Sequence, residues 1–336
     1  MSHPRHGEPR HCAHCPGSHT GELPCLASAT AKARAWLLIE HPGPWAEDID
    51  DSPLPAPVAT AIAAARRLGV RPQLIRPVGR RHPVRPVQVY VGWSGTGPLE
   101  TRETAAGLRR PAHASAEMDR AGSGVGTAWL EGRKLADPAE LAGLDLAAVA
   151  AGRAPGFGAR VTEPVLLVCA HGRHNACCAR AGAPLARALR TRFGPSVWET
   201  SHVGGDRFAA NLVCLPHGLY YGDLGEEAAL SAVAAYQRGK VSLERFRGRA
   251  GLPEPAQAAE HHIREHTGVL DVDAVAVDSV TGADPAYDVV VRVGADRYHI
   301  NVSRAADVGP CGPGCDENRR TYLCGPPTLL NEAALV

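Results

Sequence analysis

The sequence predicts an α/β protein with more than one domain. Strand-like and helix-like segments alternate through the first two thirds of the chain, which is the pattern of a layered α/β fold. With 336 residues the chain exceeds one ordinary domain, and its 44% hydrophobic content is enough for a sizeable core. No internal repeat is visible in the sequence.

The first half contains the first of these alternations. Short apolar or alternating runs predict strands, and alanine-rich runs predict helices. The expected strands are Ala35–Glu40, Pro72–Arg76, Val87–Gly92 and Thr127–Glu131, and the expected helices are Val58–Leu68 and Ala136–Ala151. The segment HPGPW, which ends at Trp45, has turn-forming residues, and Trp45 is a candidate for covering a site.

The second half begins with a short, fully apolar run, Val165–Cys169, which predicts a buried central strand. A helix, two further strands and a second helix follow it. These elements are expected at Cys178–Phe193, Val197–Thr200, Asn211–Leu215 and Gly225–Arg238, with a turn and short strand in LPHGLYYG.

The last part of the chain predicts a small α+β unit. It consists of a helix, Pro255–Thr267, and a meander of three strands, Val272–Val280, Tyr287–Gly294 and Arg297–Val302. The domain organisation expected from these patterns is a disordered Cys- and His-containing tail (1–24), an N-terminal α/β region (25–155), a second α/β domain (160–250), the small α+β unit (254–305) and an irregular Cys-containing tail (306–336).

Composition narrows the functional class. The net charge of +1 gives no electrostatic reason to expect nucleic acid or an anionic membrane as partner. The chain shows no run of about 18 apolar residues and no apolar core of a signal peptide near its start. We therefore expect a soluble, cytoplasmic protein. In a reducing compartment its ten cysteines indicate metal or redox chemistry before disulfides.

The strongest motif is C-A-H-G-R-H-N-A-C-C, from Cys169 to Cys178. It leaves the end of the predicted central strand and enters a helix, and ligands of open α/β sheets bind at that edge. The positive end of the helix dipole would favour thiolates there, which are the metal-binding form of cysteine.

A second motif, S-H-V-G-G-D-R-F, follows the next predicted strand and brings His202 to the same edge. An iron–sulfur cluster needs four protein ligands, and imidazoles can replace some thiolates. Cys169, Cys178 and His202 supply three. Asp206 is the candidate for the fourth, and Cys177, His171 or a C-terminal cysteine are alternatives.

Other cysteines and histidines have plainer interpretations. Cys214 lies in an apolar strand and is expected in the core. His217 precedes a glycine turn and is expected to face solvent. His171 and His174 are expected to be loop hydrogen-bonders first and ligands second. The remaining cysteines are candidates for a second metal site, with zinc as the metal, or for unpaired tail residues: Cys12, Cys15, Cys25, Cys311, Cys315 and Cys324.

Two long runs around these motifs resemble the sucrase/ferredoxin-like family: VLLVCAHGRHNACCARAGAPLARAL and VWETSHVGGDRFAANLVCLPHGLYYG. CLASATAKARAWLLIEHPGPW and the TYLC tail are also similar, so the resemblance covers most of the chain from Cys25. It implies a thioredoxin-like ferredoxin domain at 160–250. It also implies a [2Fe–2S] cluster held by two cysteines and an H-x-G-G-H histidine pair. Cys169, Cys178 and His202 match, whereas Asp206 stands where the second histidine would be.

These observations favour a [2Fe–2S] protein that transfers single electrons to or from a redox partner protein. One alternative is a sugar hydrolase, as the family name suggests, but the sequence offers no recognisable pair of carboxylates for glycoside hydrolysis. A second alternative is a non-catalytic zinc-binding or partner module. A thiol–disulfide oxidoreductase is disfavoured because the two loop cysteines are not spaced as C-x-x-C.

Overall fold

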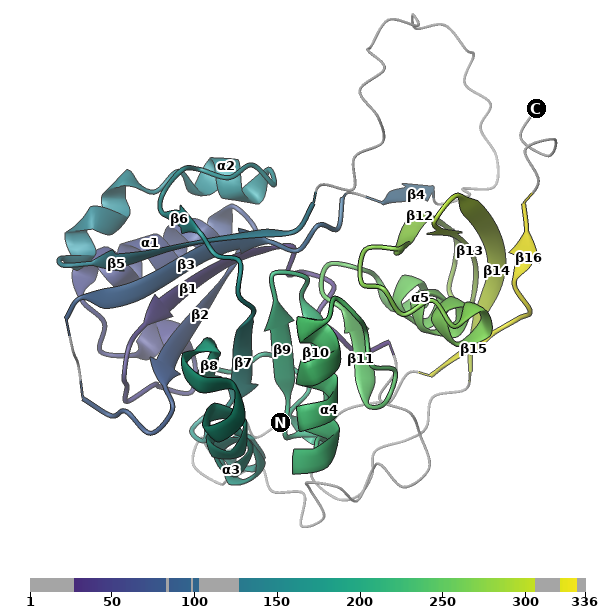
Figure 1. Cartoon of the computed structure of the whole chain (residues 1–336). Coiled ribbons are helices and arrows are strands. Elements are labelled where there is room, and N and C mark those ends of the chain that lie inside the picture. The colour runs from purple at the N-terminus through teal and green to yellow at the C-terminus, as the bar shows by residue number, and fades with distance from the viewer. Residues whose placement is uncertain (1–26, 83–84, 98, 103–126, 306–320, 331–336) are drawn as a thin grey trace, which may run out of the picture.

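The computed structural model describes residues 27–82, 85–97, 99–102, 127–305 and 321–330. They form one ten-stranded sheet, one six-stranded sheet and the helices that cover them (Figure 1). The predicted α/β class is therefore confirmed. The expected tail at 1–24, as well as Cys25, Cys311 and Cys315, lies outside the described residues.

The first half of the chain forms one side of the large sheet. Its elements are β1 (Ala35–Glu40), α1 (Ala56–Arg67), β2 (Val70–Pro77), β3 (Val87–Trp93), β5 (Trp129–Leu135), α2 (Leu146–Ala150) and β6 (Ala159–Arg160). The helix expected at Ala136–Ala151 is instead a 3-10 helix followed by α2. It is interrupted because Asp137 and Asp145 each cap a separate helix start.

The second half forms the other side, and its order of elements matches the prediction. It contains β7 (Val165–Cys169), α3 (Ala176–Phe193), β8 (Val197–Thr200), β9 (Leu212–Leu215), β10 (Leu219–Tyr221), α4 (Glu226–Gln237) and β11 (Phe246–Arg249). The central strand β7 is parallel to β8 and antiparallel to β9, and β10 pairs antiparallel with β9.

The two halves repeat one topology, although the sequence shows no repeat. In each half a central strand pairs with a parallel strand and an antiparallel strand, in the order β5-β3-β1-β2 and β10-β9-β7-β8. The halves join where β2 pairs antiparallel with β8, at Ile75 and Thr200. Ile75 also pairs with Glu40, the last residue of β1, and Thr200 also pairs with Cys169, the last residue of β7. The repeat therefore has an approximate twofold axis near this pair.

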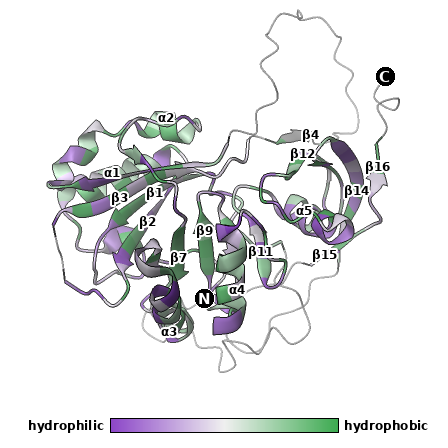
Figure 2. Ribbon diagram, viewed as in Figure 1, coloured by the Kyte–Doolittle hydropathy of each residue, from purple (hydrophilic) through white to green (hydrophobic). Residues whose placement is uncertain are grey.

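The large sheet curls, so that its inner face buries residues of both halves in one core. Trp36 and Leu38 of β1 belong to the same buried cluster as Leu167 and Cys169 of β7. The edge-to-face contact between Tyr90 and Trp198 also crosses between the halves. The alternate residues point outward, where α1 and α2 cover the first half and α3 and α4 cover the second. Figure 2 shows the resulting hydrophobic strands, such as β7 and β9, behind helices that also carry hydrophilic residues.

The second sheet confirms the predicted helix and meander. It is packed on α5 (Glu254–Thr267) and contains β12 (Val275–Ala283), β13 (Ala286–Val293) and β14 (Asp296–Arg304). Three short strands complete it: β4 (Glu100–Arg102), β15 (Tyr322–Cys324) and β16 (Thr328–Leu329). The tail expected to be irregular therefore contains β15 and β16. Within the described ranges, no helix is both long and apolar enough to cross a membrane.

His217, in the turn between β9 and β10, was predicted to face solvent, and that prediction is wrong. Its side chain is 18% exposed, and its Nε2 atom lies 3.4 Å from Asp273. Its Nδ1 atom lies 2.7 Å from the Tyr236 hydroxyl oxygen. Burial, helped by the charge of Arg249, lowers the pKa of His217 to about 4.

We expect His217 to make the protein less stable at acid pH. Its pKa in the unfolded chain is near 6.5, above the folded value, so its neutral form favours folding above pH 6.5. That contribution is lost as the pH falls from 6.5 towards 4, by at most about 3 kcal/mol. Urea unfolding of wild type and His217→Asn at pH 7.5 and 4.5 measures it. The wild type should lose more free energy of unfolding between these pH values than the variant, and equal losses would contradict the prediction.

Candidate metal centre

The first cysteine of the site is placed by strand β7 and the second by helix α3. Cys169 is the last residue of β7, and both it and Cys178 are buried. Helix α3 starts at Ala176 because Asn175 caps it, its Oδ1 accepting the Cys177 backbone N–H at 2.8 Å. Cys178 therefore lies in the first turn of α3, beside the end of β7.

The histidine of the site comes from the neighbouring strand. Because β7 and β8 are parallel and adjacent, the chain leaves both at the same edge of the sheet. His202 follows β8 by two residues. Gly205 then adopts a left-handed backbone conformation, with a φ of 70°, and turns the loop into the short 3-10 helix Asp206–Phe208.

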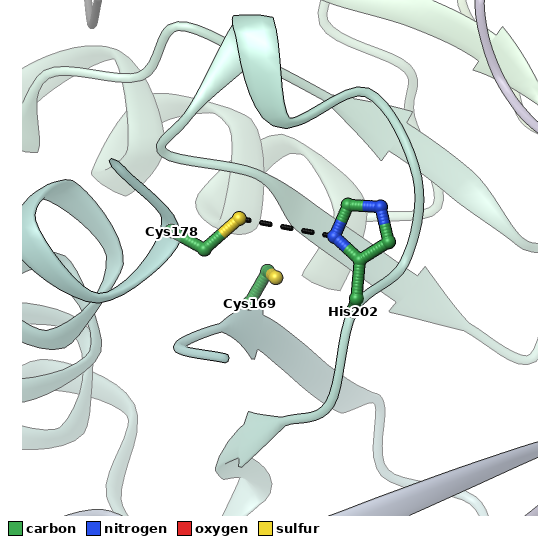
Figure 3. A group of neighbouring side chains, drawn as sticks. All are labelled: Cys169, Cys178 and His202. Carbon is green, nitrogen blue, oxygen red and sulfur yellow. Dashed lines mark hydrogen bonds between the residues drawn. The ribbon is translucent and has the colours of Figure 1, made fainter. Parts of the chain in front are cut away.

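Cys169, Cys178 and His202 converge at this edge. One donor atom from each lies within 4.8 Å of the other two. The Cys178 Sγ atom is 3.8 Å from His202 Nδ1, and Figure 3 shows the three side chains pointing toward one another from strand, helix and loop. The structure thus brings together the three residues that the sequence singled out.

The hydrogen bond between the two thiols shifts their pKa values in opposite directions. A hydrogen bond from Cys178 lowers the pKa of Cys169, with His202 and the His171 backbone N–H acting in the same direction. That hydrogen bond, together with burial, raises the pKa of Cys178. Cys169 is therefore the thiol that is favoured as thiolate, and a bound cation would displace the proton of Cys178.

Asp206, the candidate for the fourth ligand, lies outside this group of three. Its carboxylate instead accepts a hydrogen bond from the side-chain amide of Asn175. Cys177 is buried next to Cys178 but is also outside the group. Among the other cysteines, Cys214 is fully buried in β9, as predicted, and Cys324 is half-buried in β15, in the other sheet.

The first half of the chain covers the site, which sequence reasoning anticipated only for Trp45. The Trp45 and His171 rings pack edge to face, with their centroids 5.7 Å apart. The guanidinium carbon of Arg76 lies over the Trp45 ring, 4.0 Å from its centroid. The carbonyl oxygens of Ala46 and Glu47 lie 2.6 Å and 3.2 Å from ring nitrogens of His171 and His174.

Gln73 of β2 holds the second loop and was missed in the sequence. Its side-chain amide donates to the His202 carbonyl at 3.2 Å, and its oxygen accepts the Ser201 hydroxyl at 2.7 Å. The sequence carries no signal for this role, because a lone glutamine in a strand is recognisable as a loop anchor only once β2 and β8 are seen to pair.

The equivalent position in the first half carries different chemistry. Glu40 ends β1 as Cys169 ends β7, and its carboxylate accepts from the Gln88 backbone N–H and pairs with Arg80. The repeated topology therefore supplies two equivalent sheet edges, and the convergence of thiols and imidazole lies at the edge of the second half.

The donor set fits a metal of intermediate softness. Thiolates and imidazoles ligate both zinc and the iron of iron–sulfur clusters, with tetrahedral geometry at each metal. Metal–ligand bonds of about 2.0–2.3 Å place neighbouring tetrahedral ligands roughly 3.3–3.8 Å apart. The 3.8 Å separation of Cys178 Sγ and His202 Nδ1 matches that spacing.

The fold and this site define an α/β protein with a candidate Cys/His metal centre at the edge of its main sheet. A family model described as Sucrase/ferredoxin-like matches residues 26–248, which is well over half of the chain. The chain belongs to the sucrase/ferredoxin-like family. Neither a curated protein nor a solved structure matches it.

Proposed function

We propose that the chain binds a [2Fe–2S] cluster through Cys169, Cys178 and His202 and works as a one-electron carrier. The observation that carries this proposal is the convergence of two buried thiols and one imidazole within 4.8 Å. We also propose that the second half is a thioredoxin-like ferredoxin domain. Its order of strand, helix, three strands and helix around the four-stranded part of the sheet supports that assignment.

When bound, the cluster would accept and release one electron. The protein's part is to hold it, limit its contact with water and set its potential. The neutral imidazole of His202 replaces an anionic thiolate, which raises the reduction potential relative to an all-cysteine site. Trp45 and the buried His171 cover the site on the side of the first half.

The electron would reach a partner protein at the open rim of the first loop. Gly172, Arg173 and His174 are exposed there, in contrast to the buried cysteines behind them. We propose that an unidentified redox partner docks on this rim and that the exchange takes place in the cytoplasm. The near-neutral chain supports neither nucleic acid nor membrane as the partner.

A zinc-binding module and a sugar hydrolase are the two alternative functions, and the metal analysis described below distinguishes them from the redox proposal. A zinc module would use the same donors. Sugar hydrolysis would need two carboxylates facing one glycosidic bond. The nearby carboxylates are engaged otherwise: Asp206 binds Asn175, and Glu199 pairs with Arg76 at 2.7 Å and Arg81 at 3.0 Å. This arrangement favours the redox proposal over hydrolysis.

We expect full-length protein purified without oxygen to contain about two irons and two sulfides per chain, as a [2Fe–2S] cluster requires. It should show visible absorption and an EPR signal after reduction. Cys169→Ser should lose most of the iron. Cys214→Ala is the matched control, because Cys214 is equally buried but packs among the outer-face residues under α3 and α4.

Iron and sulfide analysis, absorption and EPR measure these outcomes. Stoichiometric zinc without iron in the anaerobic protein would overturn the redox proposal. Spectra of Cys169→Ser that equal those of wild type would overturn the ligand assignment, and cleavage of sucrose by metal-free protein would favour the hydrolase.

A further inference from the structure

Three converging donors leave the proposed cluster one ligand short. Four neighbouring side chains, none of which belongs to the group of three, are the candidates for that place: Asp206, His171, Cys177 and His174. The hydrogen bonds of each decide between them. This inference rests on the proposed cluster, and it concerns which side chain completes the donor set.

Asp206 already has a structural task. Its carboxylate accepts from the Asn175 side-chain amide, and the same Asn175 caps α3 through its Oδ1 atom. Asp206 therefore ties the second loop to the helix that carries Cys178. This is a positioning role, and a neutral amide at 206 could also perform it, because its carbonyl oxygen accepts the same hydrogen bond.

His171 has no ring nitrogen left for a metal. Its Nε2 atom lies 2.6 Å from the Ala46 carbonyl oxygen, which can only accept, so Nε2 carries the proton. Its Nδ1 lone pair accepts the backbone N–H of His202 at 3.1 Å. His171 thus orients the ligand loop. Cys177 is the helix neighbour of Cys178, and successive residues of a helix point about 100° apart, which turns its thiol away from the group.

His174, like Asp206 and Cys177, lies outside the group of three, but its ring keeps the nitrogen lone pair that His171 has already used. Its Nδ1 atom lies 3.2 Å from the Glu47 carbonyl oxygen, so Nδ1 carries the proton and Nε2 keeps its lone pair. Metal-binding histidines usually donate their other N–H to such an acceptor, which fixes the tautomer and strengthens the ligand. The His174 ring also stacks on His202, with centroids 3.7 Å apart and planes 23° from parallel.

We propose that His174 is the fourth ligand and that the donor set is Cys169, Cys178, His202 and His174. Two thiolates and two neutral imidazoles would then hold the cluster, and Glu47 of the first half would orient one of them. The segment Cys169–Cys178 supplies three of the four ligands, and Asp206 ties the second loop to the start of α3.

The test counts histidine nitrogens on the reduced cluster by pulsed EPR of full-length protein labelled with 15N-histidine. Wild type should show two coupled histidine nitrogens. His174→Phe keeps an aromatic ring against His202 but has no nitrogen, and it should lose the cluster or one nitrogen coupling. Asp206→Asn should keep both couplings. His299→Phe, on β14 of the other sheet, is the matched control for loss of a histidine.

His174→Cys guards against a folding defect in the phenylalanine variant. It should retain iron, show a single nitrogen coupling and have a lower reduction potential, because an anionic thiolate replaces a neutral imidazole. A wild-type cluster with a single coupled histidine nitrogen would overturn the assignment of His174 but not the proposed function. The same holds if Asp206→Asn loses the cluster while His174→Phe keeps it with both nitrogen couplings. A wild-type protein without an iron–sulfur signal overturns the proposed function itself.

Discussion

Alanine in place of Gly182 is expected to abolish metal binding and to destabilise the whole second half. Gly182 lies on the face of α3 that meets β7, and a Cβ atom there would be 1.8 Å from the carbonyl oxygen of Cys169. That oxygen belongs to the backbone of a central strand and cannot rotate away. Helix α3 would have to move off the strand, which separates Cys178 from Cys169. Overpacking of this kind costs about 1–3 kcal/mol and occasionally more.

Iron content and the free energy of unfolding in urea measure the two effects. Gly143→Ala is the matched control, because a Cβ at Gly143 meets no atom within 4 Å. The control should differ little from wild type in both measurements. A Gly182→Ala protein with normal iron content and normal stability would show that α3 does not approach Cys169 this closely.

Removal of Glu260 is expected to have the largest effect on stability outside the site. Glu260 of α5 is buried, and its carboxylate pairs with Arg249 of β11 and with Arg264 one turn along the helix, each at 3.0 Å. Burial acts to raise the pKa of Glu260, but the two arginine charges outweigh it and hold that pKa below its usual range. Glu260→Ala leaves two buried cations without their anion, which costs about 3–5 kcal/mol.

Denaturant unfolding of Glu260→Ala at pH 7 checks this loss. Asp50→Ala is the matched control, because Asp50 pairs with Arg66 at 3.0 Å on an exposed surface. Exposed pairs contribute about 0–1 kcal/mol. An equally small loss in both variants would mean that the buried triad does not hold α5 to the large sheet. The depressed pKa of Glu260 also predicts how this stabilisation depends on pH. It is present above pH 4.5 and is lost as the pH falls through the pKa of Glu260 in the folded protein.

The repeated topology explains why the site is covered on one side. The first half occupies the position beside β8 and places its own loop, Trp45 to Glu47, over the histidines. Its equivalent edge ends in Glu40, which is used for a salt bridge and a backbone contact. One half thus contributes the thiols, and the other shields them and orients the imidazoles.

The local sequence determined the elements and the three converging donors. The run VLLVC is apolar enough to require a buried strand, and the residues after β7 and β8 reach a common edge because parallel neighbours end on the same side. The same local patterns predicted α5 and the three-strand meander. These features follow from the spacing of apolar residues and turn formers over short stretches of chain.

Only the tertiary structure decided how distant segments pair and which of them cover the site. The antiparallel pairing of β2 with β8, the curl of the sheet and the docking of Trp45 on His171 depend on strand edges and side-chain shapes more than 100 residues apart. His217 became buried, against the prediction, because Tyr236 and Asp273 pack around a turn that looked solvent-exposed in sequence. Hydrophobic periodicity reports which face of a segment is buried, but it does not report which distant segment will cover that face.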